Sequence, residues 1–342
     1  MKFVLFKERE VFKALHRNQN IHCDYGNCNQ IQITHIFPYL ASNIPIFAQN
    51  LPLMQWLIFW LVYPLLWLLS RLPFWLFYKV SDLVYILIYY IVGYRKKTVR
   101  FNLKTAFPDK SEADLKQIEK KFYKHMVDMF LEMIKSISIS AAELKKRFEL
   151  PDLAIIDKLA KERRSSIIVM GHYASYEWLT ALQFYFDHSG YGIYKRIKNK
   201  YFDKLIRDIR GKWNSELLAN KEATFIIKKQ QRAGKMATYA FIADQSPKSR
   251  KNQYCTSFLG QNVPFFTGIE RLAKAENMPV LYLAVDKVKR GHYKAVFKVI
   301  TEDPQSLPDY TITDSFIKNL EEQIYNAPEY YLWTHKRFKH AQ

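Results

Sequence analysis

A histidine and a glutamate five residues apart are the side chains of this sequence best suited to acid–base chemistry. His172 follows a short apolar stretch, and Glu177 lies where a helix is expected to begin. Within one regular helix the two side chains would point about 140° apart, so His172 must lie in the preceding loop to reach the carboxylate. A glutamate at a helix N-terminus is favoured as the anion and can hold one ring nitrogen, which leaves the other nitrogen as a general base. A structural histidine beside an ordinary first-turn glutamate is the alternative.

Two polar residues after another apolar stretch are further candidates for a site. Asp244 and Gln245 follow the segment 237–243, and both side chains can hold a substrate or support the catalytic residues. That segment and the stretch 166–170 before His172 have the character of strands. In open α/β sheets, ligands bind at the carboxyl ends of the strands, so we expect the site there. A simple cap at the end of a strand is the alternative role for Asp244 and Gln245.

The segments that must position these residues alternate between strand and helix patterns. Apolar or alternating stretches predict strands at 166–170, 192–194, 237–243, 279–288 and 292–301. Helical spacing predicts helices at 176–187, 199–210, 222–233, 267–276 and 312–325. Upstream, the sequence Ser111 to Asp114 resembles a capping box before a helix with one apolar face, and Ser140 begins another helix by the same logic. The fold class is therefore α/β, with a mixed, largely parallel sheet flanked by helices.

The chain becomes strongly apolar near its N-terminal end. Residues 51–70 carry no charge and have about the 20 residues needed to cross the core of a bilayer. A second apolar stretch extends to residue 92, but Lys79 and Asp82 interrupt it, which favours a core or interfacial helix. Basic residues at 95–97 follow, and the positive-inside rule then places the C-terminal part in the cytoplasm. A pair of buried helices in a soluble protein is the alternative.

These patterns divide the chain into three parts. We expect residues 1–50 to be an N-terminal extension that is dispensable, with Met54 as an alternative start of translation. Residues 51–92 form the membrane-anchoring helices, and residues 93–342 form a cytoplasmic catalytic domain. The protein is accordingly expected at a membrane with its catalytic domain on the cytoplasmic face, and the family resemblance given below implies that this is the inner, cytoplasmic membrane.

The charge of the chain calls for an anionic partner. Lysine and arginine total 52 against 32 acidic residues, a formal net charge of +20. Eight cations lie between residues 195 and 212, where only Asp203 and Asp208 oppose them. A membrane surface, an acidic protein or a phosphorylated lipid would suit this segment, and a solvated helix face is the alternative. Nucleic acid competes as a partner, but no recognised nucleic-acid motif occurs and the apolar N-terminal segment argues against it.

Several classes of protein are disfavoured by the sequence. Only 10 glycines occur, and the chain has no P-loop, no G-x-S-x-G and no H-E-x-x-H motif. Three cysteines are too few for a disulfide scaffold, and Cys23 and Cys28 have poor spacing for a zinc site. We therefore expect no metal and no cofactor.

His172 and Glu177 together resemble the H-x4-D/E box of lysophospholipid-type acyltransferases. More closely, the chain resembles the lipid A biosynthesis late acyltransferases of Gram-negative bacteria from about Trp56 to Lys339. The residues that carry this resemblance are Tyr194, Lys195, Asn199, Asp203, Arg210, Ala243, Asp244, Gln245, Ile269 to Ala273, Pro279, Val280 and the C-terminal stretch Tyr331 to Lys339. Two departures are that Lys195 stands where relatives often carry arginine, and that the residues after Gln245 lack the usual glycine-containing turn.

The resemblance implies a fold like that of glycerolipid acyltransferases and a specific reaction. A fatty acyl chain would move from an acyl carrier protein thioester to a hydroxyl of a lipid A precursor, a phosphorylated glycolipid. His172 would be the general base and Glu177 would orient its ring. Arg210 is the leading candidate to stabilise the oxyanion, with a surface helix arginine as the alternative, and the remaining substrate-binding candidates are Asp244, Gln245 and Lys195. Another glycolipid or a lysophospholipid is an alternative acceptor, and a non-enzymatic, basic, membrane-bound binding protein is a more remote alternative.

Overall fold

The computed structural model of the chain describes residues 52–249 and 253–340. The expected N-terminal extension and the weak zinc motif at Cys23 and Cys28 lie outside the described residues.

A seven-stranded sheet forms the centre of the fold, with the order β1-β9-β8-β2-β5-β3-β4. Only β8 and β9 pair antiparallel within it, while β1 pairs parallel to β9 and the other neighbours are also parallel. The strands are β1 (Phe148–Glu149), β2 (Ser166–Met170), β3 (Ser189–Tyr194), β4 (Glu216–Ala219), β5 (Ala237–Ile242), β8 (Val280–Lys289) and β9 (His292–Thr301). The predicted α/β class with a mixed, largely parallel sheet is confirmed.

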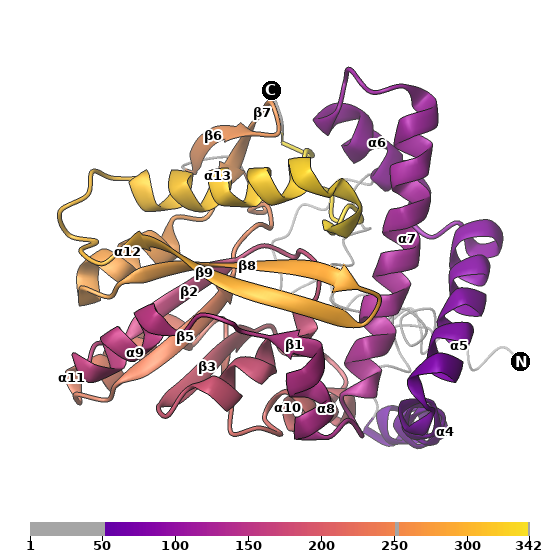
Figure 1. The fold of residues 1–342 in the computed structure, drawn as a ribbon, viewed down its shortest axis with the longest axis horizontal. Coiled ribbons are helices and arrows are strands. Elements are labelled where there is room, and N and C mark those ends of the chain that lie inside the picture. The colour runs from indigo at the N-terminus through magenta and orange to yellow at the C-terminus, as the bar shows by residue number, and fades with distance from the viewer. Residues whose placement is uncertain (1–51, 250–252, 341–342) are drawn as a thin grey trace, which may run out of the picture. The chain divides into compact units, whose positions relative to one another are not determined.

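Helices flank this sheet, and Figure 1 shows α13 above the strands and α8 below them. Helix α13 contacts β2, β8 and β9, whereas α8 contacts β1 and β9. The helices beyond the N-terminal region are α6 (Lys96–Ala106), α7 (Glu112–Lys135), α8 (Ala141–Arg147), α9 (Ala154–Lys161), the 3-10 helix η2 (Glu177–Tyr185), α10 (Lys200–Arg210), α11 (Ala223–Arg232), α12 (Gly268–Glu276), α13 (Thr311–Asn326) and the 3-10 turn η3 (Pro328–Tyr330).

The expected helix caps are present. The Ser111 hydroxyl accepts a hydrogen bond from the backbone N–H of Asp114 at 3.1 Å and begins α7. Ser140 accepts from the backbone N–H of Glu143 at 3.2 Å and begins α8. Each cap satisfies a backbone donor that the first helical turn would leave without a partner.

Some elements are not evident from the sequence pattern. The strand expected at 192–194 extends from Ser189, and the helix expected at 176–187 is the tighter 3-10 helix η2. Strand β4 and the two-stranded hairpin of β6 (Tyr254–Phe258) and β7 (Gln261–Phe265) were not predicted. Short strands carry too few residues for an alternating pattern to stand out, so their long-range pairing decides them.

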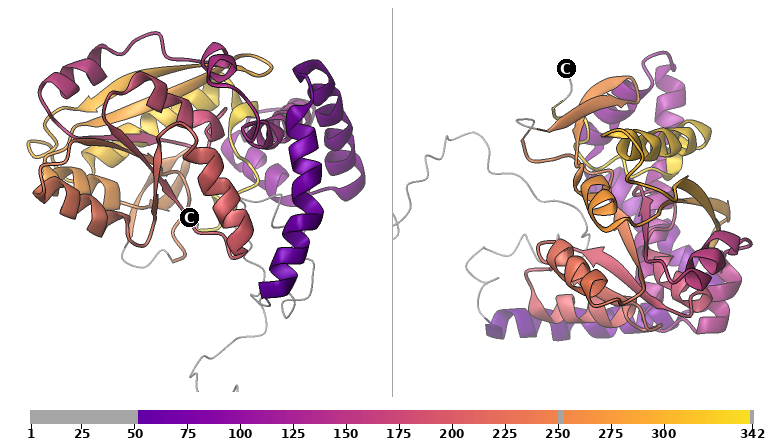
Figure 2. Two further views of the ribbon diagram at one scale, coloured as in Figure 1. Left: turned by 90° about the horizontal axis from the view of Figure 1, so that it is seen from below. Right: turned by 90° about the vertical axis from the view of Figure 1, so that its left-hand side faces the viewer.

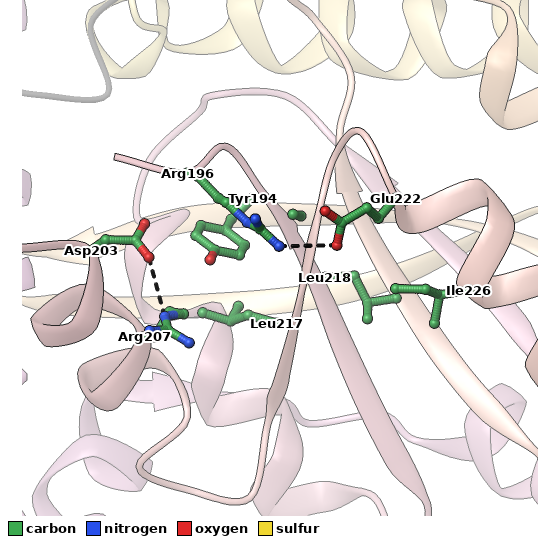
Figure 3. Close-up of a pocket in the computed structure, with 9 residues that line it drawn as sticks. Tyr194, Arg196, Asp203, Arg207, Leu217, Leu218, Glu222 and Ile226 are labelled. Carbon is green, nitrogen blue, oxygen red and sulfur yellow. Dashed lines mark hydrogen bonds and ion pairs between the residues drawn. The ribbon is translucent and has the colours of Figure 1, made fainter. Parts of the chain in front are cut away.

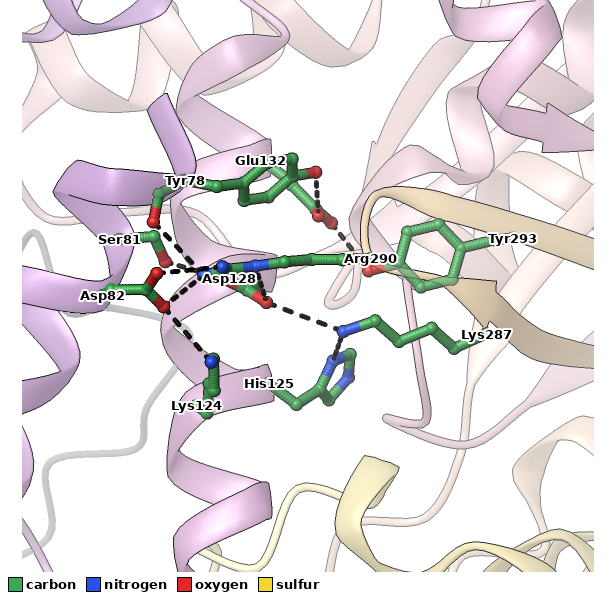
Figure 4. Close-up of polar contacts among 10 residues, drawn as sticks. All are labelled: Tyr78, Ser81, Asp82, Lys124, His125, Asp128, Glu132, Lys287, Arg290 and Tyr293. Atoms are coloured by element: carbon green, nitrogen blue, oxygen red, sulfur yellow. Dashed lines mark hydrogen bonds and ion pairs between the residues drawn. The ribbon is translucent and has the colours of Figure 1, made fainter. Parts of the chain in front are cut away.

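Helix α7 differs from the expectation of a single apolar face. Between Phe122 and Lys135 all but one residue are buried, including His125, Asp128 and Glu132. These polar groups meet side chains from α5 and from the β8–β9 hairpin (Figure 4). We call this set the α7 cluster, and its members are Tyr78, Ser81, Asp82, Lys124, His125, Asp128, Glu132, Lys287, Arg290 and Tyr293.

Two apolar helices precede α6. Helix α4 (Pro52–Arg71) and the continuous pair of α5 (Phe74–Ile86) and the π-helix η1 (Leu87–Val92) are each long and apolar enough to cross a membrane. Most of their residues are not buried by the rest of the chain. The predicted apolar helices of the 51–92 region are therefore present, and a large apolar surface remains exposed on them.

Candidate active site

The loop after β2 places His172 at the carboxyl end of the parallel sheet. Gly171 precedes it, and a Cβ atom at that position would lie 2.5 Å from the Leu320 side chain of α13, so only glycine allows this close approach. The backbone N–H of Leu332 donates to the carbonyl of His172 at 3.0 Å, and Ala174 N–H donates to the carbonyl of Tyr330 at 3.0 Å. The histidine loop is thus held by the C-terminal segment.

Asp244 is the carboxylate that contacts the His172 ring. Strands β2 and β5 are neighbours with Met170 opposite Ile242, so the residues two positions further along each strand meet. Asp244 Oδ1 lies 2.6 Å from His172 Nδ1 and accepts the backbone N–H of His172 at 3.1 Å. Burial alone would raise the pKa of Asp244, but the contacts with His172 outweigh it and lower the pKa below its ordinary value.

Glu177 holds an arginine instead of the imidazole. As the first residue of η2 it is buried, and both of its carboxylate oxygens accept from Arg210 Nη2, at 3.1 and 2.8 Å. Arg210 is the last residue of α10, and its side chain is about one-fifth exposed. Burial disfavours the charge on Arg210, but Glu177 raises the pKa of the guanidinium above its ordinary value. The prediction that Glu177 orients the ring of His172 is therefore wrong in this structure, as is the alternative of Arg210 as a surface residue.

Tyr176 lies near both the His172–Asp244 pair and the Glu177–Arg210 pair. Its ring packs edge-on against the His172 ring, with the ring centroids 4.9 Å apart. Burial, followed by the charge of Glu177, raises the pKa of the Tyr176 hydroxyl well above its ordinary value. No role for Tyr176 was predicted from the sequence, although its position between His172 and Glu177 was a signal.

Gln245 and Lys195 lie at the same edge of the sheet. The side-chain nitrogen of Gln245 is 3.4 Å from His172 Nε2, the ring nitrogen that Asp244 does not contact. Lys195 follows β3, the neighbour of β5, and partial burial with nearby lysines lowers the pKa of its amine. The structure therefore brings His172, Asp244 and Gln245 together, while Lys195 lies one strand further along.

Residues near the C-terminus bind the segment that follows Asp244 and Gln245. Arg337 is almost fully buried between the rings of Phe258 and Phe265, and it donates to Ser246 Oγ at 2.7 Å. The backbone N–H of Ser246 donates to His335 Nε2 at 3.1 Å, which requires this nitrogen to be unprotonated. Burial lowers the pKa of His335 to about 4. These contacts fit a structural clamp on the segment that follows Asp244.

A cavity of about 400 Å³ opens between β3, β4, α10 and α11, at the carboxyl ends of the two strands (Figure 3). Arg196 and Arg207 line it, and each is paired with a carboxylate, Glu222 at 3.0 Å and Asp203 at 3.2 Å. Lys204 is likewise paired with Asp208 at 2.5 Å. Together with Arg210, four of the eight cations of the 195–212 segment have acidic partners, two of which come from outside it. The segment is less basic than its local sequence indicates.

Within residues 52–249 and 253–340, no group of three or more His, Cys, Asp or Glu side chains could hold a metal ion. The arrangement at the sheet edge is that of an acid–base site: an imidazole with one nitrogen held by a buried carboxylate, beside a partly exposed, carboxylate-bound guanidinium.

Comparison with known proteins identifies the class of enzyme to which this sheet edge belongs. Residues 44–340 match the family of bacterial lipid A biosynthesis acyltransferases, so the chain is a member of that family. It is also similar to the lipid A biosynthesis lauroyltransferase of Escherichia coli (strain K12), with 25% identity over 299 residues that cover 87% of this chain and 96% of the relative. The family match begins at residue 44, upstream of Met54 and inside the segment expected to be an extension.

Proposed function

We propose that this enzyme transfers a fatty acyl chain from a thioester of an acyl carrier protein to a hydroxyl of a lipid A precursor. Membership of the lipid A acyltransferase family supports the class of acceptor. The single observation that carries the chemistry is the His172–Asp244 pair at the carboxyl end of the parallel sheet, at 2.6 Å. The E. coli relative is named for transfer of a lauroyl group, which supports a fatty acyl donor.

His172 acts as the general base in this proposal. With Nδ1 held by Asp244, Nε2 is the nitrogen that takes the proton of the attacking hydroxyl. The new oxygen–carbon bond forms first and gives a tetrahedral intermediate. When this intermediate collapses, the carbon–sulfur bond of the thioester breaks and the proton passes from His172 to the departing thiolate. Asp244 stabilises the imidazolium that forms between these steps because it is ionised and buried against the ring.

Arg210 is proposed to stabilise the oxyanion of the tetrahedral intermediate. Its guanidinium binds Glu177 through Nη2 and is partly exposed, which leaves further N–H donors for a substrate. A charged donor held in place before the reaction lowers the energy of a developing negative charge without reorganisation. Glu177 is then a positioning residue that acts through Arg210.

The cavity between Arg196 and Arg207 is proposed to receive an anionic part of the acceptor or donor. It lies at the same edge of the sheet as His172 and Asp244, and the side chains of both arginines remain more than half exposed there. A phosphate offers bidentate geometry to arginine and can bind such exposed guanidinium groups. Gln245 and Lys195 complete the polar groups proposed for the acceptor.

The function is tested with the purified full chain and defined substrates. Acyl carrier protein and coenzyme A thioesters of several chain lengths are incubated with a lipid A precursor, and products are identified by mass spectrometry. We expect one added acyl chain on the precursor, faster with the acyl carrier protein donor. Mass spectrometry of lipid A from a strain lacking the gene should show that the same acyl chain is missing.

Other outcomes separate the alternatives. Acylation of a lysophospholipid or another glycolipid in preference to the lipid A precursor would show that this other lipid is the acceptor. Salt-sensitive binding of an anionic partner without transfer to any acceptor would contradict the proposed reaction.

A further inference from the structure

Both ends of helix α4 are bound to the catalytic domain. Near the start of α4, Gln55 accepts hydrogen bonds from Asn199 Nδ2 at 3.3 Å and from the backbone N–H of Lys200 at 3.2 Å, both at the beginning of α10. Near the end of α4, the carbonyl of Ser70 accepts from Lys135 Nζ of α7 at 2.7 Å. The helix therefore contacts polar groups of one domain at two points that are 15 residues apart, about 22 Å along its axis.

The contact continues between these two points along one face of α4. Phe59 packs against Tyr201 and Phe202 of α10, with ring centroids 5.7 and 5.3 Å apart, and it stacks on Tyr63. Leu66 is buried one turn further on. In Figure 2, right, α4 runs along the lower edge of the domain.

The opposite face of α4 is apolar and exposed. Its side chains retain between 42% and 75% of their accessible surface, far more than a helix buried in a soluble core would. They are Leu53, Trp56, Leu57, Trp60, Leu61, Leu65 and Leu68.

A transverse path for α4 conflicts with its contacts. If the helix crossed the bilayer, the start of α10 would lie about 22 Å deep beside Gln55. Helix α10 carries Lys200, Lys204, Arg207 and Asp208 on exposed positions, and such charges are costly in hydrocarbon. A helix bound to one domain along its whole length can instead lie in the plane of the membrane surface.

The second apolar helix points to the same arrangement. Figure 1 shows α4 end-on while α5 runs in the plane of the view, so the two do not form an antiparallel hairpin that could cross together. The inner face of α5 contributes polar residues to the α7 cluster: Ser81 donates to Asp128 at 2.7 Å, and Asp82 pairs with Arg290 at 2.8 Å (Figure 4). The exposed face of α5 and η1 is apolar apart from Lys79, whose long side chain can carry its charge to the headgroups. Its apolar members are Trp75, Leu83, Ile86, Leu87, Tyr90, Ile91 and Val92.

We propose that α4 and α5 do not cross the membrane, and that they lie in its surface and insert their exposed apolar faces into one lipid leaflet. Tryptophans at 56, 60 and 75 suit the interface between headgroups and acyl chains. The cations beside α4, Arg71 and Lys200, suit anionic headgroups. This topology is independent of the proposed reaction, because it rests on the contacts of the two helices with the domain.

The first test measures on which side of the membrane each end of α4 lies. In a full-length chain with Cys23, Cys28 and Cys255 replaced by serine, a single cysteine is introduced as Pro52→Cys, Arg71→Cys or Ser257→Cys. Ser257 is exposed on β6 and marks the side of the catalytic domain. A membrane-impermeant maleimide is applied to intact cells and to inverted membrane vesicles, and detergent-solubilised membranes give the total reactive cysteine.

We expect all three cysteines to be labelled in inverted vesicles and to be protected in intact cells. Labelling of Pro52→Cys from the side opposite to Ser257→Cys would overturn the proposal. Protection of Pro52→Cys in both preparations, with full labelling in detergent, would overturn it as well.

The second test measures insertion from one side directly. The purified full chain is diluted from detergent onto preformed vesicles of phosphatidylglycerol or phosphatidylcholine. We expect spontaneous binding, stronger to phosphatidylglycerol, and a loss of at least about tenfold in partitioning for Leu61→Lys with Leu65→Lys. Phe225→Lys with Val299→Lys replaces exposed apolar residues elsewhere and serves as the matched control, with binding unchanged. Equal binding of the α4 variant and the control would overturn the proposal, provided that circular dichroism shows both folded.

Discussion

Two clusters of buried ionisable residues differ in what surrounds their histidines. At the sheet edge, His172 has a carboxylate on Nδ1 and a glutamine beside Nε2. In the α7 cluster, Lys287 donates toward His125 Nδ1 at 3.2 Å, and burial together with that lysine lowers the pKa of His125 well below its ordinary value. A histidine beside a cation stays neutral and gains no help in accepting a proton, so burial of a histidine by itself does not indicate catalysis.

The carboxylates of the two clusters differ in the same way. Asp128 is bound by Arg290 at 2.6 Å, Lys287 at 3.6 Å and Ser81, so it joins α5, α7 and the β8–β9 hairpin. Glu132 accepts from two tyrosine hydroxyls, and burial raises its pKa to about 7. These groups satisfy one another between packed elements: all three nitrogens of the Arg290 guanidinium donate to Asp82 or Asp128, whereas Arg210 donates to Glu177 through Nη2 alone. The first arrangement suits stability and the second suits binding and catalysis.

The largest expected effect separates the two histidines. His172→Ala should lower kcat by about 10²–10⁴-fold with the fold intact, because it removes the proposed general base. His125→Gln is the matched control, since glutamine can still accept from Lys287, and it should change the melting temperature more than kcat. Steady-state kinetics and thermal denaturation in detergent measure both. Near-normal turnover by folded His172→Ala would remove the distinction between the clusters.

A charge deletion in the α7 cluster should act on stability. Asp128→Ala removes the carboxylate that the buried Lys287 shares with Arg290, while the partly exposed Arg290 keeps Asp82. It should lower the free energy of unfolding by about 3 kcal/mol, the low end for breaking a buried ion pair. Glu322→Ala breaks the exposed pair with Lys298, 3.0 Å apart, and should cost at most about 1 kcal/mol. Denaturant unfolding compares the two variants. Equal losses would show that the α7 cluster contributes no more than a surface ion pair.

The clamp beneath the sheet edge should make stability depend on pH. His335 has a pKa of about 4 in the folded chain against an ordinary value of 6.5, so between these values the unfolded chain binds a proton that the folded chain does not. Stability should therefore fall as the pH falls from 6.5 to 4, by up to about 3 kcal/mol. Comparison with His335→Gln at pH 7.5 and 4.5 isolates this contribution. A wild-type loss no greater than that of the variant would contradict it.

The partner of the catalytic imidazole should influence turnover more than binding. Asp244→Asn keeps the shape of the side chain but removes the charge that stabilises the imidazolium, so kcat should fall by about 10²-fold with little change in KM. The pH–rate profile gives a second readout, because it should change when the anion beside the catalytic base is lost. An unchanged profile would indicate that Asp244 has only a structural role.

The smallest effect concerns the exposed lysines of the 195–212 segment. Lys198→Glu, Lys200→Glu and Lys204→Glu together should raise KM several-fold and weaken its salt dependence, because such charges act by steering an anionic substrate. Kinetics at two salt concentrations, in detergent and with donor and acceptor varied separately, identify which substrate is affected. A KM that does not depend on salt and that the triple reversal leaves unchanged would show that these lysines are only a solvated surface and do not steer a substrate.

Local patterns account for much of the fold. The strands at 166–170 and 237–243 and the helices after Ser111 and Ser140 have sequences whose periodicity and caps determine their type. The apolar character of residues 51–92 is likewise local. The pattern missed the short strand β4, and it missed that the C-terminal half of α7 is buried on all sides, because such burial depends on neighbours from distant parts of the chain.

The sequence by itself determined that a histidine, a glutamate and an aspartate lie at strand or helix ends where chemistry is possible. Only the tertiary structure decided which carboxylate serves which cation. The order of β2 beside β5 brings Asp244, 72 residues away, to the ring of His172, while α10 carries Arg210 to Glu177. Strand order is a property of long-range pairing, so a spacing of five residues in the sequence could not show that the nearer carboxylate has a different partner.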